Sequence, residues 1–277
     1  MMKSKRLELI DSIRGLTLIS MILYHFCWDL KYLKGFSMLW YETFGSYLWQ
    51  QSICWTFILI AGFCLHFARN PIRNGVIVFL CGIIITTVTE LFVPEAPVYF
   101  GVLTFLGSAM IIVGALKWVL IKLIPGKTAD ISSNPDNNQN NKRDFGILLD
   151  PFWGFIVNII LFGFTKSINQ GVINLFLTKI NLPANLFDGS SSGGVNGSFL
   201  NYLGFMQNDF YSSDYFSLMP WIFLFLSGYF LYGVLKPRFE SAAFHINIKP
   251  LSWIGRHSLL IYMLHQPVLY GITMLIR

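Results

Sequence analysis

Long runs of apolar residues, separated by short polar stretches, follow one another along most of the chain. A helix needs about 20 mostly apolar residues to cross the hydrocarbon core of a bilayer. The runs are continuously apolar rather than alternating, which predicts helices and not the strands of a barrel. The predicted membrane helices cover residues 10–33, 47–68, 72–92, 97–120, 147–167, 215–235 and 253–275.

The composition agrees with this pattern. Of the 277 residues, 54% are hydrophobic and only 12% are charged, about half the charged fraction of a typical soluble domain. The predicted fold class is therefore an all-α polytopic membrane helix bundle with about seven transmembrane helices. The net charge of +6 does not indicate nucleic acid, because the basic residues lie in the loops, where they orient a membrane protein.

Lysine and arginine are unevenly divided between the two sets of loops. With the N-terminus inside, the inner segments hold fourteen basic residues and the outer segments hold five. The excess of positive charge on the cytoplasmic side predicts an N-terminus inside and a C-terminus outside. The predicted location is the inner (cytoplasmic) cell membrane, crossed several times.

One membrane domain is predicted over residues 1–277, with two polar segments in its loops. The Asn-rich stretch 126–144 is predicted to be a disordered inner linker. The long outer loop 168–213 contains the run "SSSGGVNGS" and apolar patches such as "INLFL". It is either a flexible connection or a lid or re-entrant segment over a site, since long loops are often functional.

The first predicted helix carries four ionisable side chains in "LELIDSIRGLTLISMILYHFCWDL", residues 7–30. A charge at the bilayer centre costs about 2.5–3.5 kcal/mol on insertion scales, so intramembrane ionisable groups indicate function. His25 lies 14 residues beyond Asp11, about 21 Å along the helix axis and past the midplane. Asp29, at i+4 from His25, can orient the imidazole and raise its basicity, which is typical of a general base. The alternative is a packing histidine beside an aspartate that reaches outer water.

Asp11 and Arg14 lie near the inner surface, where two interpretations stay open. The pair can anchor the helix by extending toward water. Alternatively, the guanidinium can bind phosphate groups, for which its fork geometry is suited. Gly15 beside it allows a close backbone approach.

A second polar cluster lies in the last predicted helix, in "WIGRHSLLIYMLHQPVLY" (253–270). Ser258, Tyr262 and His265 fall on one helical face, and Arg256 and His257 lie toward the inner end. His265 is about 13–14 Å deeper than Arg256, so His25 and His265 are expected to approach the middle of the membrane from two different helices. Tyr262 is either part of this site or an ordinary hydrogen-bonded core tyrosine.

A third set, Thr86, Thr89 and Glu90, shares one face of the third predicted helix, although threonines in membrane helices often bond only to the backbone. No metal site is predicted, because His257 and His265 are too far apart and neither HExxH nor CxxC occurs.

Four segments, "RLELIDSIRGLTLISMILYHFCWDL", "FGVLTFLGSAM", "LMPWIFLFLSGYFL" and "LSWIGRHSLLIYMLHQPVL", together resemble the heparan-alpha-glucosaminide N-acetyltransferase catalytic-domain family in its small prokaryotic branch. The DxxRG start also looks like the wider transmembrane acyltransferase superfamily. The resemblance implies transfer of an acyl group, in this family acetyl, from cytosolic acyl-CoA (acetyl-CoA) to a sugar or glycan at or across the membrane. Acyl-CoA is then a cosubstrate, and no bound cofactor is expected.

The family's catalytic histidine lies in the loop after the first helix, whereas this chain has no histidine between residues 30 and 65. The assignment of His25 as the base therefore rests on its depth and not on the resemblance.

The working hypothesis is a membrane acyltransferase with a catalytic centre in the outer half and a substrate-binding inner rim. His25 is the general base, oriented by Asp29, and His265 and Tyr262 bind or polarise the acyl carbonyl. The inner rim that holds the CoA phosphates is formed by Asp11, Arg14, Arg256, His257 and Ser258.

The alternative is a non-enzymatic transporter or channel in which the same polar residues line a pathway. In either case the expected partners are the lipid bilayer and a glycan or small-molecule substrate, not nucleic acid. Assembly into a homo-oligomer is left open.

Overall fold

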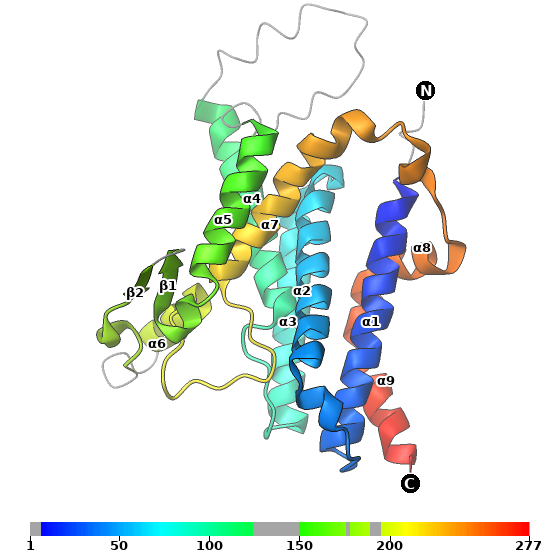
Figure 1. The fold of residues 1–277 in the computed structure, drawn as a ribbon, viewed down its shortest axis with the longest axis vertical. Coiled ribbons are helices and arrows are strands. Elements are labelled where there is room, and N and C mark those ends of the chain that lie inside the picture. Colours follow the sequence, from blue (N-terminus) through cyan, green and yellow to red (C-terminus); the bar gives the residue numbers. More distant parts are fainter. Residues whose placement is uncertain (1–6, 124–149, 176–177, 189–194, 277) are drawn as a thin grey trace, which may run out of the picture. The chain divides into compact units, whose positions relative to one another are not determined.

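The computed structural model describes residues 7–123, 150–175, 178–188 and 195–276. Seven helices in these ranges are long and apolar enough to cross a membrane, which confirms the predicted all-α polytopic fold class. They are α1 (Glu8–Tyr32), α2 (Phe44–Cys64), α3 (Pro71–Phe92), α4 (Val102–Leu123), α5 (Pro151–Thr165), α7 (Leu218–Leu235) and α9 (Ser258–Leu275) (Figure 1). The predicted linker 126–144 lies outside the described residues.

Local chemistry explains where the helix boundaries differ from the predicted ones. α4 begins at Val102 rather than at residue 97, after a loop in which Phe100 has a positive φ of 53°. α5 begins at Pro151, where the carboxylate of Asp150 caps the helix by accepting hydrogen bonds from the backbone N–H groups of the first turn. The last predicted span is interrupted at His257, so that a short helix, α8 (Lys249–Arg256), precedes α9.

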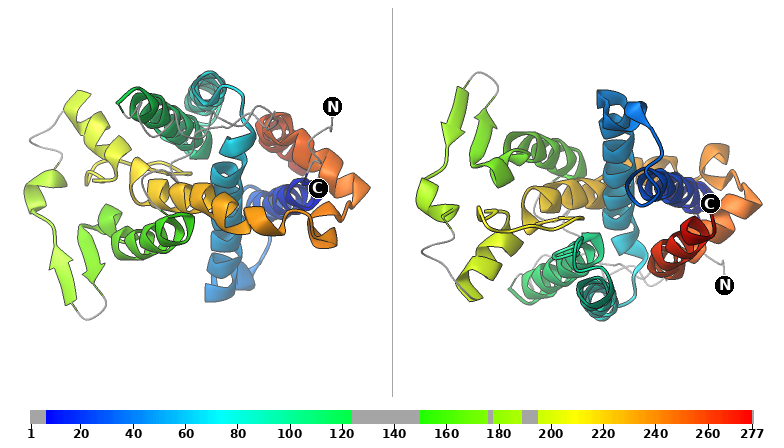
Figure 2. Two further views of the ribbon diagram at one scale, coloured as in Figure 1. Left: turned by 90° about the horizontal axis from the view of Figure 1, so that it is seen from above. Right: turned by 90° about the horizontal axis from the view of Figure 1, so that it is seen from below.

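The chain forms two compact units, one made of residues 1–61 with 235–277 and the other of residues 62–234. In the first unit α8 and α9 both lie beside α1, as the two end-on views confirm (Figure 2). This unit also contains the short 3-10 helix Leu39–Glu42 and most of α2. Every residue of the predicted catalytic and substrate-binding sites belongs to this unit.

In the second unit α3 and α4 pack along each other (Figure 2). Glycines make this contact unusually close: a Cβ on Gly82 would lie 2.6 Å from the backbone nitrogen of Thr104. A Cβ on Gly107 would lie 2.5 Å from the nitrogen of Phe79. The two backbones therefore touch without intervening side chains, a packing that is common between membrane helices.

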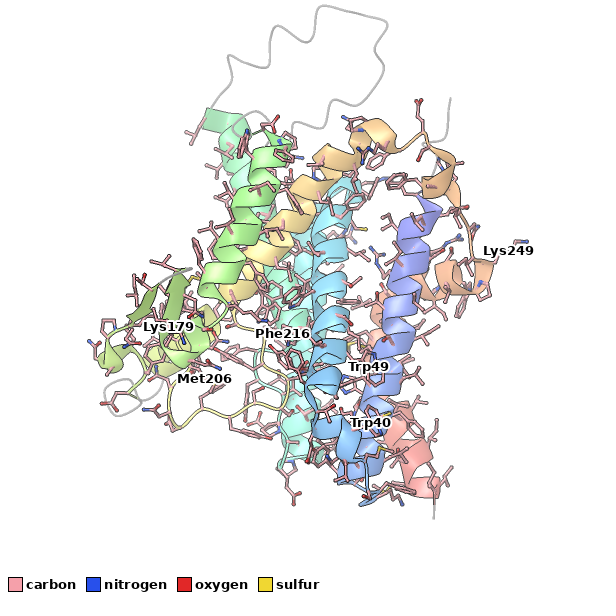
Figure 3. All side chains as sticks on the ribbon, viewed as in Figure 1. Trp40, Trp49, Lys179, Met206, Phe216 and Lys249 are labelled. Atoms are coloured by element: carbon pink, nitrogen blue, oxygen red, sulfur yellow. The ribbon has the colours of Figure 1, made fainter. Side chains whose placement is uncertain are left out.

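The predicted outer loop 168–213 contains regular structure in its described parts. Strands β1 (Val172–Leu175) and β2 (Thr178–Asn181) form an antiparallel hairpin, and α6 (Val195–Leu203) follows. The buried side chain of Gln207 donates to the carbonyl of Leu186 at 2.6 Å. Figure 3 labels Lys179 on β2 and Met206 just after α6. The hairpin was not predicted, and a role as a lid stays a prediction.

Asp214, just before α7, is partly buried and accepts a hydrogen bond from the backbone N–H of Val102. Burial raises the pKa of Asp214 to about 6, although the hydrogen bond opposes the shift. The folded state therefore binds this proton more tightly than the unfolded chain does. Stability from this group is present at low pH and is lost as the pH rises from about 4 to about 6, by at most about 3 kcal/mol.

Asp214→Asn should remove that loss while it keeps a side-chain oxygen for Val102. The thermal midpoint is measured in detergent at pH 4 and at pH 7. We expect the decrease between the two pH values to be smaller in the variant than in the wild type. Identical pH profiles for the two proteins would show that Asp214 titrates normally.

Candidate active site

The N-terminal half of α1 is fixed against α8 by two glycines. A Cβ on Gly15 would overlap the carbonyl oxygen of Leu251, and a Cβ on Gly255 would overlap the carbonyl oxygen of Asp11. The close backbone approach at Gly15 is therefore that of α8. Beside this contact the buried hydroxyls of Ser12 and Ser252 form a hydrogen bond of 2.8 Å. Close packing and a buried polar pair together fix how α1 lies on α8.

This contact brings three charged side chains together. The Nε of Arg256 lies 3.6 Å from Oδ2 of Asp11, and Nη1 of Arg14 lies 4.0 Å from Oδ1 of the same carboxylate. Arg14 also donates to the carbonyl of Gly255 at 3.5 Å. Among the described residues, two guanidinium groups thus share one carboxylate. A guanidinium group can bind an anion such as phosphate or carboxylate through two parallel hydrogen bonds.

The last two predicted inner-rim residues lie at the break between α8 and α9. His257 is exposed, and its Nδ1 lies 2.9 Å from the carbonyl of Trp253, whose ring it packs on at 4.6 Å. Ser258 is the first residue of α9 and is partly buried. Both residues follow Arg256 directly, so they lie near the charged cluster in the fold as well as in the sequence.

The two deep histidines contact each other in the structure. The ring centroids of His25, on α1, and His265, on α9, are 5.1 Å apart. The ring of Tyr262 lies 5.1 Å from that of His265 and 6.0 Å from that of Phe57, on which it stacks. Tyr262 is buried. Three polar rings from two helices therefore form one cluster within the span, where a proton can be exchanged between imidazoles.

Asp29 is fully buried one turn after His25. Its Oδ1 accepts a hydrogen bond of 3.2 Å from Nε2 of Gln266, which follows His265 on α9. The predicted orientation of the His25 ring by this carboxyl group stays a prediction. In the sequence Gln266 is a polar residue directly before Pro267, and nothing there predicts its contact with Asp29.

Aromatic side chains surround the C-terminal part of α1. The ring of Tyr24 lies 5.0 Å from that of Tyr41 and 5.2 Å from that of Trp49. Trp49 donates to the hydroxyl of Ser20 at 2.8 Å and stacks on Trp40, with ring centroids 6.2 Å apart (Figure 3). These rings pack on the side of α1 that carries Tyr24. The ring of Tyr24 also contacts that of His25, so aromatic side chains lie next to the histidine cluster.

The charged cluster and the histidine cluster lie on the same helix, α1. Asp11 and His25 are 14 residues apart, which corresponds to about 21 Å along a helix. The first cluster can hold an anionic group, and the second can accept or donate a proton. The two clusters are therefore separated along the axis of α1.

Seven membrane-length helices with polar side chains buried among them define a multi-pass helical membrane protein. The family model described as "Heparan-alpha-glucosaminide N-acetyltransferase, catalytic" matches residues 6–128 and 144–267. The chain therefore belongs to this family, whose name denotes a membrane acetyltransferase activity, and the expected resemblance is confirmed. No curated protein and no solved structure matches the chain.

Proposed function

We propose that the protein transfers an acyl group, most simply acetyl, from acyl-CoA to a sugar or other glycan acceptor at the membrane. The observation that carries the proposal is the pairing of two clusters on α1. Arg14 and Arg256 form a cationic site around Asp11, and His25 and His265 form an imidazole pair about 16–21 Å further along the helix. Coenzyme A has the same division, since its phosphates and its thioester are separated by the long pantetheine arm.

At the histidine cluster, His25 acts as the general base. It takes the proton from the amine or hydroxyl of the acceptor as that group attacks the thioester carbonyl. The carbon–sulfur bond then breaks, and the CoA thiolate leaves with the electron pair. The rings of His265 and Tyr262 contact each other. Both residues are assigned to binding or polarising the acyl carbonyl.

The cationic site binds the CoA phosphates. Arg14 and Arg256 supply the guanidinium groups, and Asp11 holds both of them in place. His257 and Ser258 border the same site. Because one carboxylate faces two cations, a phosphate can be bound without first breaking every ion pair.

The direct test is an assay with the purified protein in detergent or in proteoliposomes. Labelled acetyl-CoA is offered with a panel of amino sugars and glycans, and both acetylated product and released CoA are measured. We expect release of CoA that depends on the protein and on an acceptor. Transport of a solute without any consumption of acetyl-CoA would instead support the carrier hypothesis.

Arg14→Lys should weaken acetyl-CoA binding by about tenfold or more and leave the apparent affinity for the acceptor unchanged. Lysine keeps the positive charge but loses the bidentate fork that fits phosphate. The measurement is the Kd of acetyl-CoA, with Arg73→Lys on α3 as the matched control. An unchanged Kd would show that Arg14 only anchors α1.

For the acyl-CoA site to face the cytosol, the N-terminal end of α1 must lie inside. The basic residues of the loops support this orientation. A reporter fused after Arg277 should therefore be found outside, and one inserted at Asn138 should be found inside. Detection of both reporters on the same side would contradict the proposed orientation.

A further inference from the structure

Asp29 and Gln266 face each other with complementary atoms. Nε2 of Gln266 donates to Oδ1 of Asp29 at 3.2 Å. The other oxygen of each group, Oδ2 of Asp29 and Oε1 of Gln266, is buried and has no hydrogen-bond partner among the described residues. Each of these oxygens is attached to the same carbon as an atom of the existing hydrogen bond. Both groups therefore present one bonded atom and one unsatisfied oxygen.

If Asp29 were ionised, neither of the two unsatisfied oxygens would have a hydrogen-bond donor in this pair. Buried polar atoms are nearly always hydrogen-bonded, and a buried carboxylate also needs a cation or several donors. Among the described residues, the ion pairs of α1 do not include Asp29. Lys31, the nearest cation in the sequence, lies 2.6 Å from Glu42. By position along the two helices, the titratable groups within one turn of the pair include His25 and Tyr32 on α1 and Tyr262 and His265 on α9.

We propose that Asp29 carries a proton on Oδ2 and donates it to Oε1 of Gln266. One proton then satisfies both unsatisfied oxygens and closes a cyclic carboxylic acid–amide pair with two hydrogen bonds. The pair is neutral, which suits a fully buried position within a membrane helix. Gln266 is thereby a positioning residue that keeps Asp29 in its acid form.

The role of this pair in the reaction rests on the proposed function. A neutral Asp29 provides no counter-charge for an imidazolium, so His25 stays a neutral base that can accept the acceptor's proton. The acid is also a protonated group one turn from the histidine pair. This assignment replaces the role of an orienting carboxylate that the i+4 spacing predicted for Asp29.

Infrared spectroscopy of the protein in lipid at pH 8 tests the proposal without substrate. A protonated carboxyl group has a carbonyl band that is separate from the carboxylate bands. We expect this band in the wild type and its loss in Asp29→Asn, which retains the shape and both hydrogen bonds of the pair. Asp11→Asn is the matched control on the same helix, because Asp11 is ion-paired with two arginines, and it should leave the band in place.

Gln266→Leu removes the partner but keeps Asp29, so the band should shift in frequency or disappear. A wild type without the band, or a band that survives in Asp29→Asn, would overturn the protonated state. A band that is unchanged in Gln266→Leu would overturn the role of Gln266. Because the band requires no turnover, a protein that shows it but transfers no acyl group would refute the proposed function alone.

Discussion

Replacing His25 by alanine should lower the rate of acyl transfer by about 10²–10⁴-fold, the usual contribution of a positioned general base. Acyl transfer to an amine or a hydroxyl requires a proton to be removed as the new bond forms. His25 is the histidine of α1, and its ring faces that of His265. The variant should still fold and bind acetyl-CoA, because the cationic site lies about 16–21 Å away along the helix. Turnover and the Kd of acetyl-CoA are the two measurements.

Two comparisons make this result specific to the base. Asp29→Asn should cost less than His25→Ala, because it changes a neighbour of the base and leaves the base itself. The lower limb of the pH–rate profile should disappear in the His25 variant only. Full turnover in His25→Ala, together with its loss in His265→Ala, would move the base to α9 and leave His25 as a buried packing residue.

The largest effect on stability is expected from Gly15→Ala. The added methyl group would overlap the carbonyl oxygen of Leu251 on α8, and backbone cannot move aside as a flexible side chain can. Overpacking of this kind costs about 1–3 kcal/mol or more. The thermal midpoint in detergent should fall sharply, and the cationic site should be lost with it, because Arg256 is positioned by the same contact.

Gly271→Ala on α9 is the matched control. A Cβ at Gly271 would meet nothing within 4 Å, and alanine is the better helix former by about 1 kcal/mol. This variant should melt at or above the temperature of the wild type. Equal melting of Gly15→Ala and Gly271→Ala would mean that α1 and α8 do not pack through their backbones.

The long helices could be predicted from the sequence because a bilayer imposes a length and a composition that few other structures share. The similar depth expected of His25 and His265 could also be derived, since helical rise sets the depth of a residue on any helix that crosses the membrane. Their contact, in contrast, was shown only by the structure. These arguments need only local sequence and the thickness of the membrane.

Partners across helices could not be predicted in the same way. The hydrogen bond between Gln266 and Asp29 joins residues 237 positions apart, and it depends on how α9 is rotated against α1. The break at His257 also escaped prediction, because the sequence around it is helical in character on both sides. The hairpin β1–β2 lies in a loop whose short apolar patches have no clear period.

The break at His257 adds backbone groups to the electrostatics of this region, beyond what the side chains provide. Because α9 starts anew at Ser258, the N–H groups of its first turn lack partners within the helix, and the aligned peptide dipoles end there with about half a positive charge. This charge belongs to the backbone and follows directly after Arg256. A single unbroken helix over 249–275 would have only one positive end, at Lys249. The interruption therefore places two kinds of backbone group beside the arginines. The N–H groups that begin α9 can donate to a bound group, and the last carbonyls of α8, whose end charge is the opposite one, can accept, as that of Gly255 does from Arg14.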